Sequence, residues 1–188
     1  MSSEIVKSPR DRIIDVAGPL FYREGFRAIG VDRVIAEADV AKATFYKHFP
    51  SKDDLMAAWV LRAEERSSAN LPAEDGPRAL SDYADAMINI ARQDYCLGCT
   101  YQGTAAEFSD LSHPAHAAGL AVKRRVLAAL HRRAVAQGLA DPDRVAEQVF
   151  LLLEGVWAAA RMFRTDAPLA HAKDAVARLI GDGRGFVP

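Results

Sequence analysis

Apolar residues recur along almost the whole chain with the spacing of an amphipathic helix. Ile13, Ile14, Ala17, Leu20 and Phe21 occupy positions i, i+1, i+4, i+7 and i+8, which places them on one face of a helix. Alternation with the period of a β-strand is nearly absent. The pattern therefore predicts an all-α protein with about nine helices.

Helix-breaking and capping residues divide this pattern into elements. Three short helices and a longer fourth are predicted over about residues 9–66, and the Pro- and Gly-containing stretch 67–77 reads as a connection. Further helices are predicted over about 80–91, 100–108, 114–138, 142–163 and 172–180. Pro19 predicts a kink, or a split at Gly18, because proline cannot donate to the carbonyl of Asp15.

Composition and charge describe an ordinary globular chain. Among 188 residues, 24 Lys and Arg stand against 25 Asp and Glu, for a net charge of -1, which excludes a bulk polycation that coats nucleic acid. No apolar run reaches the ~20 residues of a membrane span, and no secretion signal opens the chain. Two cysteines cannot form a disulfide scaffold. We expect a soluble, cytoplasmic protein with no membrane partner.

Residues 31–49 have the layout of a helix-turn-helix. Two short predicted helices are separated by only Asp39, Val40 and Ala41. The apolar back face would consist of Ala38, Val40, Phe45 and Phe49, and the exposed face of Lys42, Ala43, Thr44, Tyr46, Lys47 and His48. Residues 40–52 contain three lysines and no acidic residue, a local excess of charge that suits a surface facing phosphates.

The segment 30–55, GVDRVIAEADVAKATFYKHFPSKDDL, resembles the DNA-binding domain of the tetracycline-repressor (TetR/AcrR) family, as does the preceding segment around 13–26. This resemblance covers about a third of the chain. It implies a helix-turn-helix DNA-binding domain over residues 1–50 and a helical ligand-binding and dimerisation domain over 51–188.

The resemblance also implies functional residues, position by position. Contacts with double-stranded DNA fall to Lys42, Ala43, Thr44, Tyr46, Lys47, His48 and Lys52, with Arg10 and Arg12 as further candidates for the backbone. The pocket for a small molecule is assigned to Tyr83, Met87, Ile90, Tyr101, Phe108, Leu152, Trp157 and Phe163, although such residues can also be plain packing. The interface of a homodimer is assigned to Val149, Leu153, Val156, Ala160, Val176 and Leu179, with burial in the chain's own core as the alternative.

Three positions of the helix-turn-helix depart from the family's pattern. Val31 stands where a threonine usually caps the helix and touches phosphate, and Asp39 stands where glycine is usual at the turn. Asp tolerates a left-handed backbone better than most residues. Ala43 replaces a common glycine, and its methyl group could meet the methyl of a thymine.

The sequence favours a ligand-responsive regulator, most simply a repressor that binds a near-palindromic operator as a dimer and is released by a small molecule. An activator or a ligand-independent DNA-binding regulator of the same fold remains open. A small helical enzyme that uses Cys96 and Cys99, or Glu107 with a histidine, is a remote alternative, because none of the common catalytic motifs is present. Neither a cofactor nor a metal is expected, since the Cys-x-x-Cys pair has no second pair to complete a zinc site.

Overall fold

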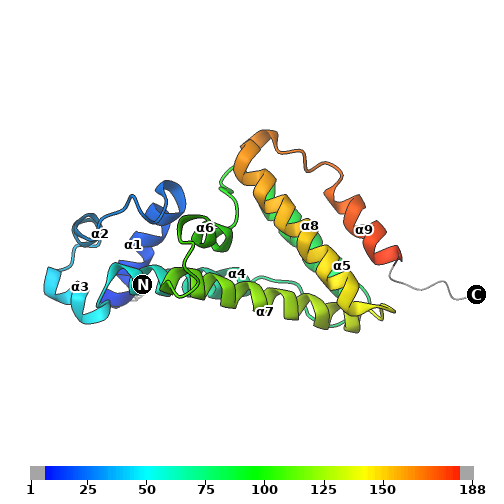
Figure 1. Ribbon diagram of the computed structural model, residues 1–188, viewed down its shortest axis with the longest axis horizontal. Coiled ribbons are helices and arrows are strands. Elements are labelled where there is room, and N and C mark those ends of the chain that lie inside the picture. The colour runs from blue at the N-terminus through cyan, green and yellow to red at the C-terminus, as the bar shows by residue number, and fades with distance from the viewer. Residues whose placement is uncertain (1–6, 183–188) are drawn as a thin grey trace, which may run out of the picture. The chain divides into compact units, whose positions relative to one another are not determined.

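The computed structural model describes residues 7–182, and within this range the chain is entirely helical (Figure 1). The prediction of an all-α protein is confirmed. The elements are α1 (Pro9–Glu24), α2 (Val31–Glu37), α3 (Lys42–His48), α4 (Lys52–Ser68), α5 (Ala79–Ala91), α6 (Thr100–Glu107), α7 (Pro114–Ala136), α8 (Pro142–Phe163), a 3-10 turn η1 (Arg164–Asp166) and α9 (Ala172–Asp182).

Local capping explains where several helices begin and end. The amide of Asp54 donates to Ser51 Oγ over 3.1 Å while the amide of Ser51 donates to Asp54 Oδ2 over 3.0 Å, a reciprocal cap at the start of α4. Asp141 caps α8 with Pro142 at its first position. Gly138, with φ of +75°, follows the end of α7.

Helix α1 is not split at Pro19, contrary to one of the two outcomes expected from the sequence. The helix continues because its apolar face, which includes Ile14, Ala17 and Phe21, is buried on both sides of the proline. Gly18 has a packing role, since a Cβ at this position would lie 2.0 Å from Nε1 of Trp59. The indole of α4 therefore packs directly against the backbone of α1.

The contacts divide the chain into two compact units. Among the described residues, the first contains 7–66 together with 100–122, so that α6 and the first turns of α7 belong with α1–α4. The second contains 67–99 and 123–182. The predicted boundary at residue 50 lies inside the first unit, because α4 and α6 pack with the three N-terminal helices.

Each unit has its own apolar core. In the first, the rings of Phe21, Phe26 and Trp59 contact one another, with centroids 5.3–6.1 Å apart. In the second, α5, α8 and α9 pack together around a cluster that includes Leu80, Ile88, Val149 and Ile180 (Figure 1). Burial of such side chains contributes about 1.5–3 kcal/mol each, and this stabilises both units.

Candidate nucleic-acid interface

The turn between α2 and α3 is a Schellman motif with an aspartate at the left-handed position. The amide of Asp39 donates to Ala36 O and the amide of Val40 donates to Ile35 O, each over 3.3 Å. Asp39 has a φ of +49°, a left-handed conformation that glycine adopts without steric cost and that aspartate adopts at a lower cost than most residues. This strained position sets the direction in which α3 leaves α2.

Replacing Asp39 with glycine is expected to raise the free energy of unfolding by about 0.5–1 kcal/mol, because removing a steric cost of roughly 1–2 kcal/mol outweighs the greater backbone entropy that glycine loses on folding. Asp39→Ala, which keeps a Cβ without the polar group, is expected to give no such gain. Urea denaturation of the two variants and the parent measures the difference. A destabilised Asp39→Gly variant would show that the aspartate side chain stabilises the turn.

Helix α3 is anchored by its aromatic side and presents its polar side to solvent. Phe45 and Phe49 are 0% and 2% exposed, and Ala38 of the preceding turn is also buried, so these members of the predicted back face are confirmed. Val40 is only half-buried. On the other side, Lys42, Ala43, Tyr46 and Lys47 are exposed, and Thr44 and His48 are half-buried. The six predicted DNA-facing residues of α3 thus lie outside the core, on the side of the helix opposite to Phe45 and Phe49.

The three lysines that are predicted to contact DNA have different environments. Lys42 Nζ lies 3.4 Å from Asp32 Oδ1, in an exposed pair that solvent screens. Lys52 is half-buried, and its Nζ donates to Arg27 O over 3.2 Å. Partial burial lowers the pKa of Lys52, with the neighbouring Asp53 acting against this effect. Lys52 therefore already holds the α1–α2 loop, whereas Lys42 and Lys47 extend from α3 into solvent.

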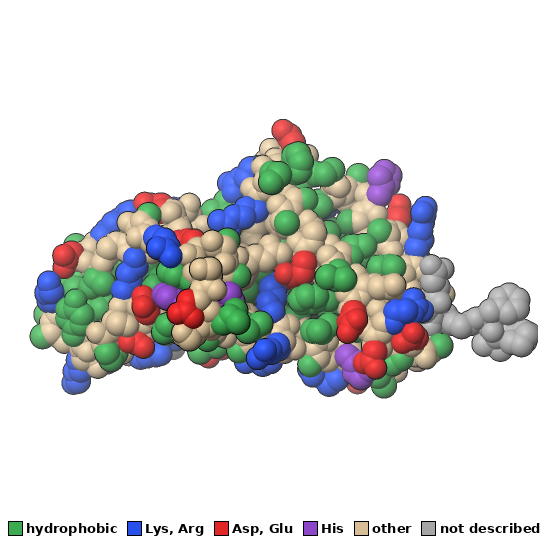
Figure 2. Space-filling view, in the orientation of Figure 1, with side chains coloured by type: hydrophobic (Ala, Val, Ile, Leu, Met, Phe, Trp, Pro, Cys, Tyr) green, Lys and Arg blue, Asp and Glu red, His purple; other side chains and the backbone are tan. Residues whose placement is uncertain are grey.

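Arginines from α1 and α2 flank α3 in different ways. The guanidinium of Arg10 lies 5.4 Å from the ring centroid of Phe49, beside the end of α3. Arg33 binds Glu24 and Glu37 over 2.7 Å and 2.8 Å, and these carboxylates raise its pKa. Arg33 is thus used to join α2 to α1. Figure 2 shows basic and acidic side chains interspersed over the visible face, in agreement with the near-zero net charge.

The α1–α2 loop is held by the last residue of α6, in a contact that we call the Glu107 clamp. The amides of Phe26 and Arg27 donate to Glu107 Oε1 and Oε2, each over 2.9 Å. In return, Nε and Nη2 of Arg27 donate to the backbone oxygen of Glu107 over 3.0 Å and 2.8 Å. Gly25, with φ of +89°, lets the chain approach, since a Cβ there would lie 3.1 Å from Glu107 Oε1.

Aromatic and histidine contacts continue the clamp into the α6–α7 corner. The ring of Phe108 stacks on His113 with a centroid distance of 3.8 Å, and the guanidinium of Arg27 lies 5.1 Å from the Phe108 centroid. His116 Nδ1 lies 2.6 Å from Phe108 O, and His113 Nε2 lies 3.5 Å from Asp53 Oδ2 at the start of α4. From the sequence, Glu107 is only a remote catalytic candidate, and no neighbouring residue marks it as a partner of residues 80 and 81 positions away.

The predicted pocket residues are distributed over both units. Tyr83, Met87, Leu152 and Trp157 contribute to the core of the second unit, where the first two are buried and the other two partly buried. Ile90 and Phe163 are 38% and 51% exposed. Tyr101 and Phe108 belong to the first unit. Their assignment to a ligand pocket stays a prediction.

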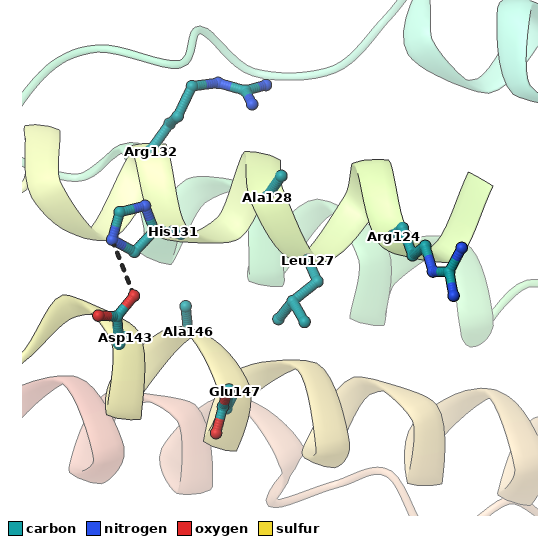
Figure 3. Close-up of a pocket in the computed structure, with 8 residues that line it drawn as sticks. All are labelled: Arg124, Leu127, Ala128, His131, Arg132, Asp143, Ala146 and Glu147. Carbon is teal, nitrogen blue, oxygen red and sulfur yellow. Dashed lines mark ion pairs between the residues drawn. The ribbon is translucent and has the colours of Figure 1, made fainter. Parts of the chain in front are cut away.

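An open groove lies elsewhere in the second unit, between α7 and α8 (Figure 3). It has a volume of about 400 Å³, and none of the predicted pocket residues lines it. Leu127 and Ala146 face each other across the groove, and His131 Nε2 lies 3.0 Å from Asp143 Oδ1. Arg132 points away from α8. The groove is open and mixed in charge, which differs from the enclosed apolar site expected for a small effector.

Most of the predicted interface residues are used inside the chain. Five of them are 0–5% exposed within the core of the second unit, and Leu179 is partly buried against it; the five are Val149, Leu153, Val156, Ala160 and Val176. Helix α8 is apolar on nearly all sides, so its pattern did not show which face turns inward. The exposed face carries Leu151, Gly155, Ala158 and Met162 instead.

The residues of the enzymatic alternative lie in settings that leave them little access. Cys96 and Cys99 are both buried free thiols, and both carboxylate oxygens of Glu107 accept backbone hydrogen bonds. Among residues 7–182, no three His, Cys, Asp or Glu side chains gather as a metal site would require. In the same range no helix is both long and apolar enough to cross a bilayer.

Comparison with known proteins identifies both parts of the chain. Residues 13–59 match the family model described as bacterial regulatory proteins, tetR family, and residues 76–176 match the model of the tetracyclin repressor-like C-terminal domain. The chain is 27% identical to the HTH-type transcriptional repressor KstR of Mycobacterium tuberculosis over 97% of this chain and 85% of that protein. KstR of Rhodococcus jostii is 38% identical over 66 residues, which are 35% of this chain and 31% of that protein.

Solved structures agree over nearly the full length. SCO4454, a TetR-family transcriptional regulator from Streptomyces coelicolor, is 28% identical, with a TM-score of 0.82 over 94% of this chain and 96% of that one. A regulator of the same kind from Streptomyces avermitilis is also 28% identical, with a TM-score of 0.83 over 94% and 98% of the two chains.

Proposed function

The chain belongs to the TetR family of bacterial transcriptional regulators, and from this premise we propose that it is a repressor that binds a near-palindromic operator as a homodimer and is released by a small-molecule effector. The exposed, lysine-bearing face of α3, held on the buried aromatic residues Phe45 and Phe49, is the observation that carries the proposal. Relatives described as repressors support the sign of regulation.

In this proposal α3 enters the major groove and reads it with a few side chains. Lys42 and Lys47 donate to phosphates or to the O6 and N7 atoms of guanine, and the methyl of Ala43 contacts thymine. Tyr46, which is 45% exposed, donates its hydroxyl to the backbone. Lys52 contributes as a half-buried charge near the start of α4, because its ammonium already holds Arg27 O.

The effector acts by favouring a state of the dimer in which the two copies of α3 are spaced too closely or too widely to enter successive major grooves. Such coupling is typically worth about 1–3 kcal/mol. The Glu107 clamp supports this proposal, because it joins α6 to the loop that precedes α2 and α3 by four hydrogen bonds. A displacement of α6 would therefore change the position of the reading helix.

A second copy is proposed to pack on the exposed face of α8. Leu151 and Met162 are 68% and 79% exposed, and Gly155 and Ala158 lie between them on the same helix face. A Cβ at Gly155 would meet nothing within 4 Å, so another helix could approach closely. This stripe replaces the buried residues that the sequence had favoured for the interface.

Leu151→Arg is expected to weaken dimerisation by about 100-fold, because two unpaired guanidinium groups would be buried in a symmetric interface. Sedimentation equilibrium at several concentrations measures the change. Leu111→Arg is the matched control, since Leu111 is 66% exposed in the first unit. Equal association constants for the two variants would place the interface away from this face of α8.

The proposed function is tested with the DNA upstream of the protein's own coding sequence. Fluorescence anisotropy is expected to show specific binding that weakens steeply with salt, and footprinting is expected to show two half-sites about one helical turn, ~34 Å, apart or a small multiple of it. A reporter assay with and without the protein gives the sign of regulation. Absence of a salt-dependent shift would contradict DNA binding at this site, and higher reporter output with the protein would contradict repression.

A further inference from the structure

Arg133 is a charged side chain in the apolar core of the second unit. It lies on α7 and is 1% exposed. Its guanidinium carbon is 4.7 Å from the ring centroid of Tyr83, which is itself buried in the core cluster. Burial of an arginine is costly unless an anion and further hydrogen bonds compensate for the lost water. The partners of Arg133 are therefore informative.

Compensation at Arg133 is incomplete. Nη1 donates to Glu74 Oε1 over 2.9 Å and to the carbonyl of Ala129 over 3.4 Å, and Nη2 donates to the carbonyl of Pro72 over 3.0 Å. The buried Nε has no hydrogen-bond acceptor among residues 7–182. Glu74 offers Arg133 only one oxygen, since its other oxygen accepts from Arg132 over 2.8 Å. The guanidinium thus lacks the two-oxygen partner that its planar geometry suits best.

The anion that reaches Arg133 comes from an irregular segment. Glu74 lies in the connection between α4 and α5, which has no helix from residue 69 to 78 and contains Gly76 with φ of +106°. Glu74 remains 48% exposed although its partner is buried. Figure 3 shows that Arg132 points away from α8. The guanidinium of Arg132 donates to both carboxylate oxygens of Glu74, over 2.8 Å and 3.1 Å. A rigid cation on a helix is therefore covered by an acid on a loop.

We propose that Arg133 anchors the carboxylate of the effector in the second unit, and that Glu74 is an internal substitute which this carboxylate displaces. A free carboxylate could accept from both Nε and one Nη of Arg133, a geometry that Glu74 does not provide. Tyr83 and the other core residues around Arg133 are apolar, so the ligand class is a small carboxylic acid with an apolar body, for which benzoate is the probe. The inference rests on the proposed ligand response and names its chemistry.

Displacement would also release the segment that follows α4. Glu74 is bound by Arg132 and Arg133, and the carbonyl of Pro72 is bound by Arg133. A ligand that takes over Arg133 removes part of this attachment, and the connection directly continues the chain of α4. Binding of a carboxylate at Arg133 is thereby linked to α4, the helix that begins with Lys52.

The test compares benzoate binding to the full-length parent and to Glu74→Gln, by calorimetry and by the shift in thermal midpoint, without DNA. Glu74→Gln removes the competing charge at a half-exposed position and is expected to bind benzoate about tenfold more tightly, equal to ~1.4 kcal/mol. Benzamide, the neutral analogue, is expected to have no effect on either protein. Arg132→Gln, added to Glu74→Gln, is expected to leave benzoate affinity within about twofold, because Arg132 is not the proposed anchor.

The double variant Glu74→Gln/Arg133→Lys is expected to lose benzoate binding, because the proposed anchor is replaced. Circular dichroism is expected to show that this variant keeps its helicity. Equal benzoate responses in the parent and Glu74→Gln would overturn the proposal, as would an equal response to benzamide. The outcome is independent of DNA binding. A protein that binds its upstream DNA but fails the benzoate test retains its proposed function and loses only this anchor.

Discussion

Replacement of both Lys42 and Lys47 with alanine is expected to lower the affinity for operator DNA by about 100-fold or more near physiological salt. Both ammonium groups extend from the exposed face of α3, and the proposed dimer would lose each of them twice. The slope of log affinity against log salt is expected to fall by about 0.9 for every phosphate contact removed. Anisotropy titrations at several salt concentrations measure both quantities.

The matched control is Lys173→Ala/Arg178→Ala on α9, which changes the net charge by the same amount in the second unit. Its affinity is expected to stay within a few-fold of the parent, because distant charges are screened over about 8 Å at physiological ionic strength. An equal loss in both double variants would show that total charge, and not the surface of α3, governs DNA binding.

Glu107→Ala is expected to lower the free energy of unfolding of the first unit by about 2–4 kcal/mol, because the amides of Phe26 and Arg27 lose a charged acceptor. Glu107→Gln keeps one acceptor oxygen and is expected to lose roughly half as much. Denaturation followed by fluorescence in a Trp157→Phe background, in which Trp59 of the first unit is the sole tryptophan, gives the measurement.

Operator affinity is expected to fall together with stability in Glu107→Ala, because the clamp orients the loop before α2. Glu147→Ala serves as control, since Glu147 is exposed on α8. Unfolding curves that coincide for Glu107→Ala and the parent would mean that the clamp contributes nothing to the first unit.

Features set by neighbouring residues could be predicted from the sequence. The cap formed by Ser51 and Asp54, the start of α8 at Pro142 and the left-handed residue after α7 depend on residues within a few positions. The same holds for the helix-turn-helix, whose aromatic back face and basic front face lie within residues 38–49.

Features set by distant residues could not be predicted in this way. Glu107 meets residues 80 and 81 positions earlier, and Arg133 meets Glu74 across 59 positions. An arginine in a core also contradicts the polar-outside pattern from which helix faces are read. On α8, apolar residues on nearly all sides left the inward face undecided, and only packing against α5 and α9 settled it.

The position of α3 on DNA is tested most directly by cleavage from a reagent tethered to Ala43→Cys. Ala43 is exposed, and the native Cys96 and Cys99 are buried, so an iron chelate can be attached selectively. Cleavage is expected at two clusters of base pairs inside the footprint, one for each half-site. Absent cleavage, or the same pattern from a tether at the exposed Ala170 on the second unit, would contradict a reading helix in the major groove.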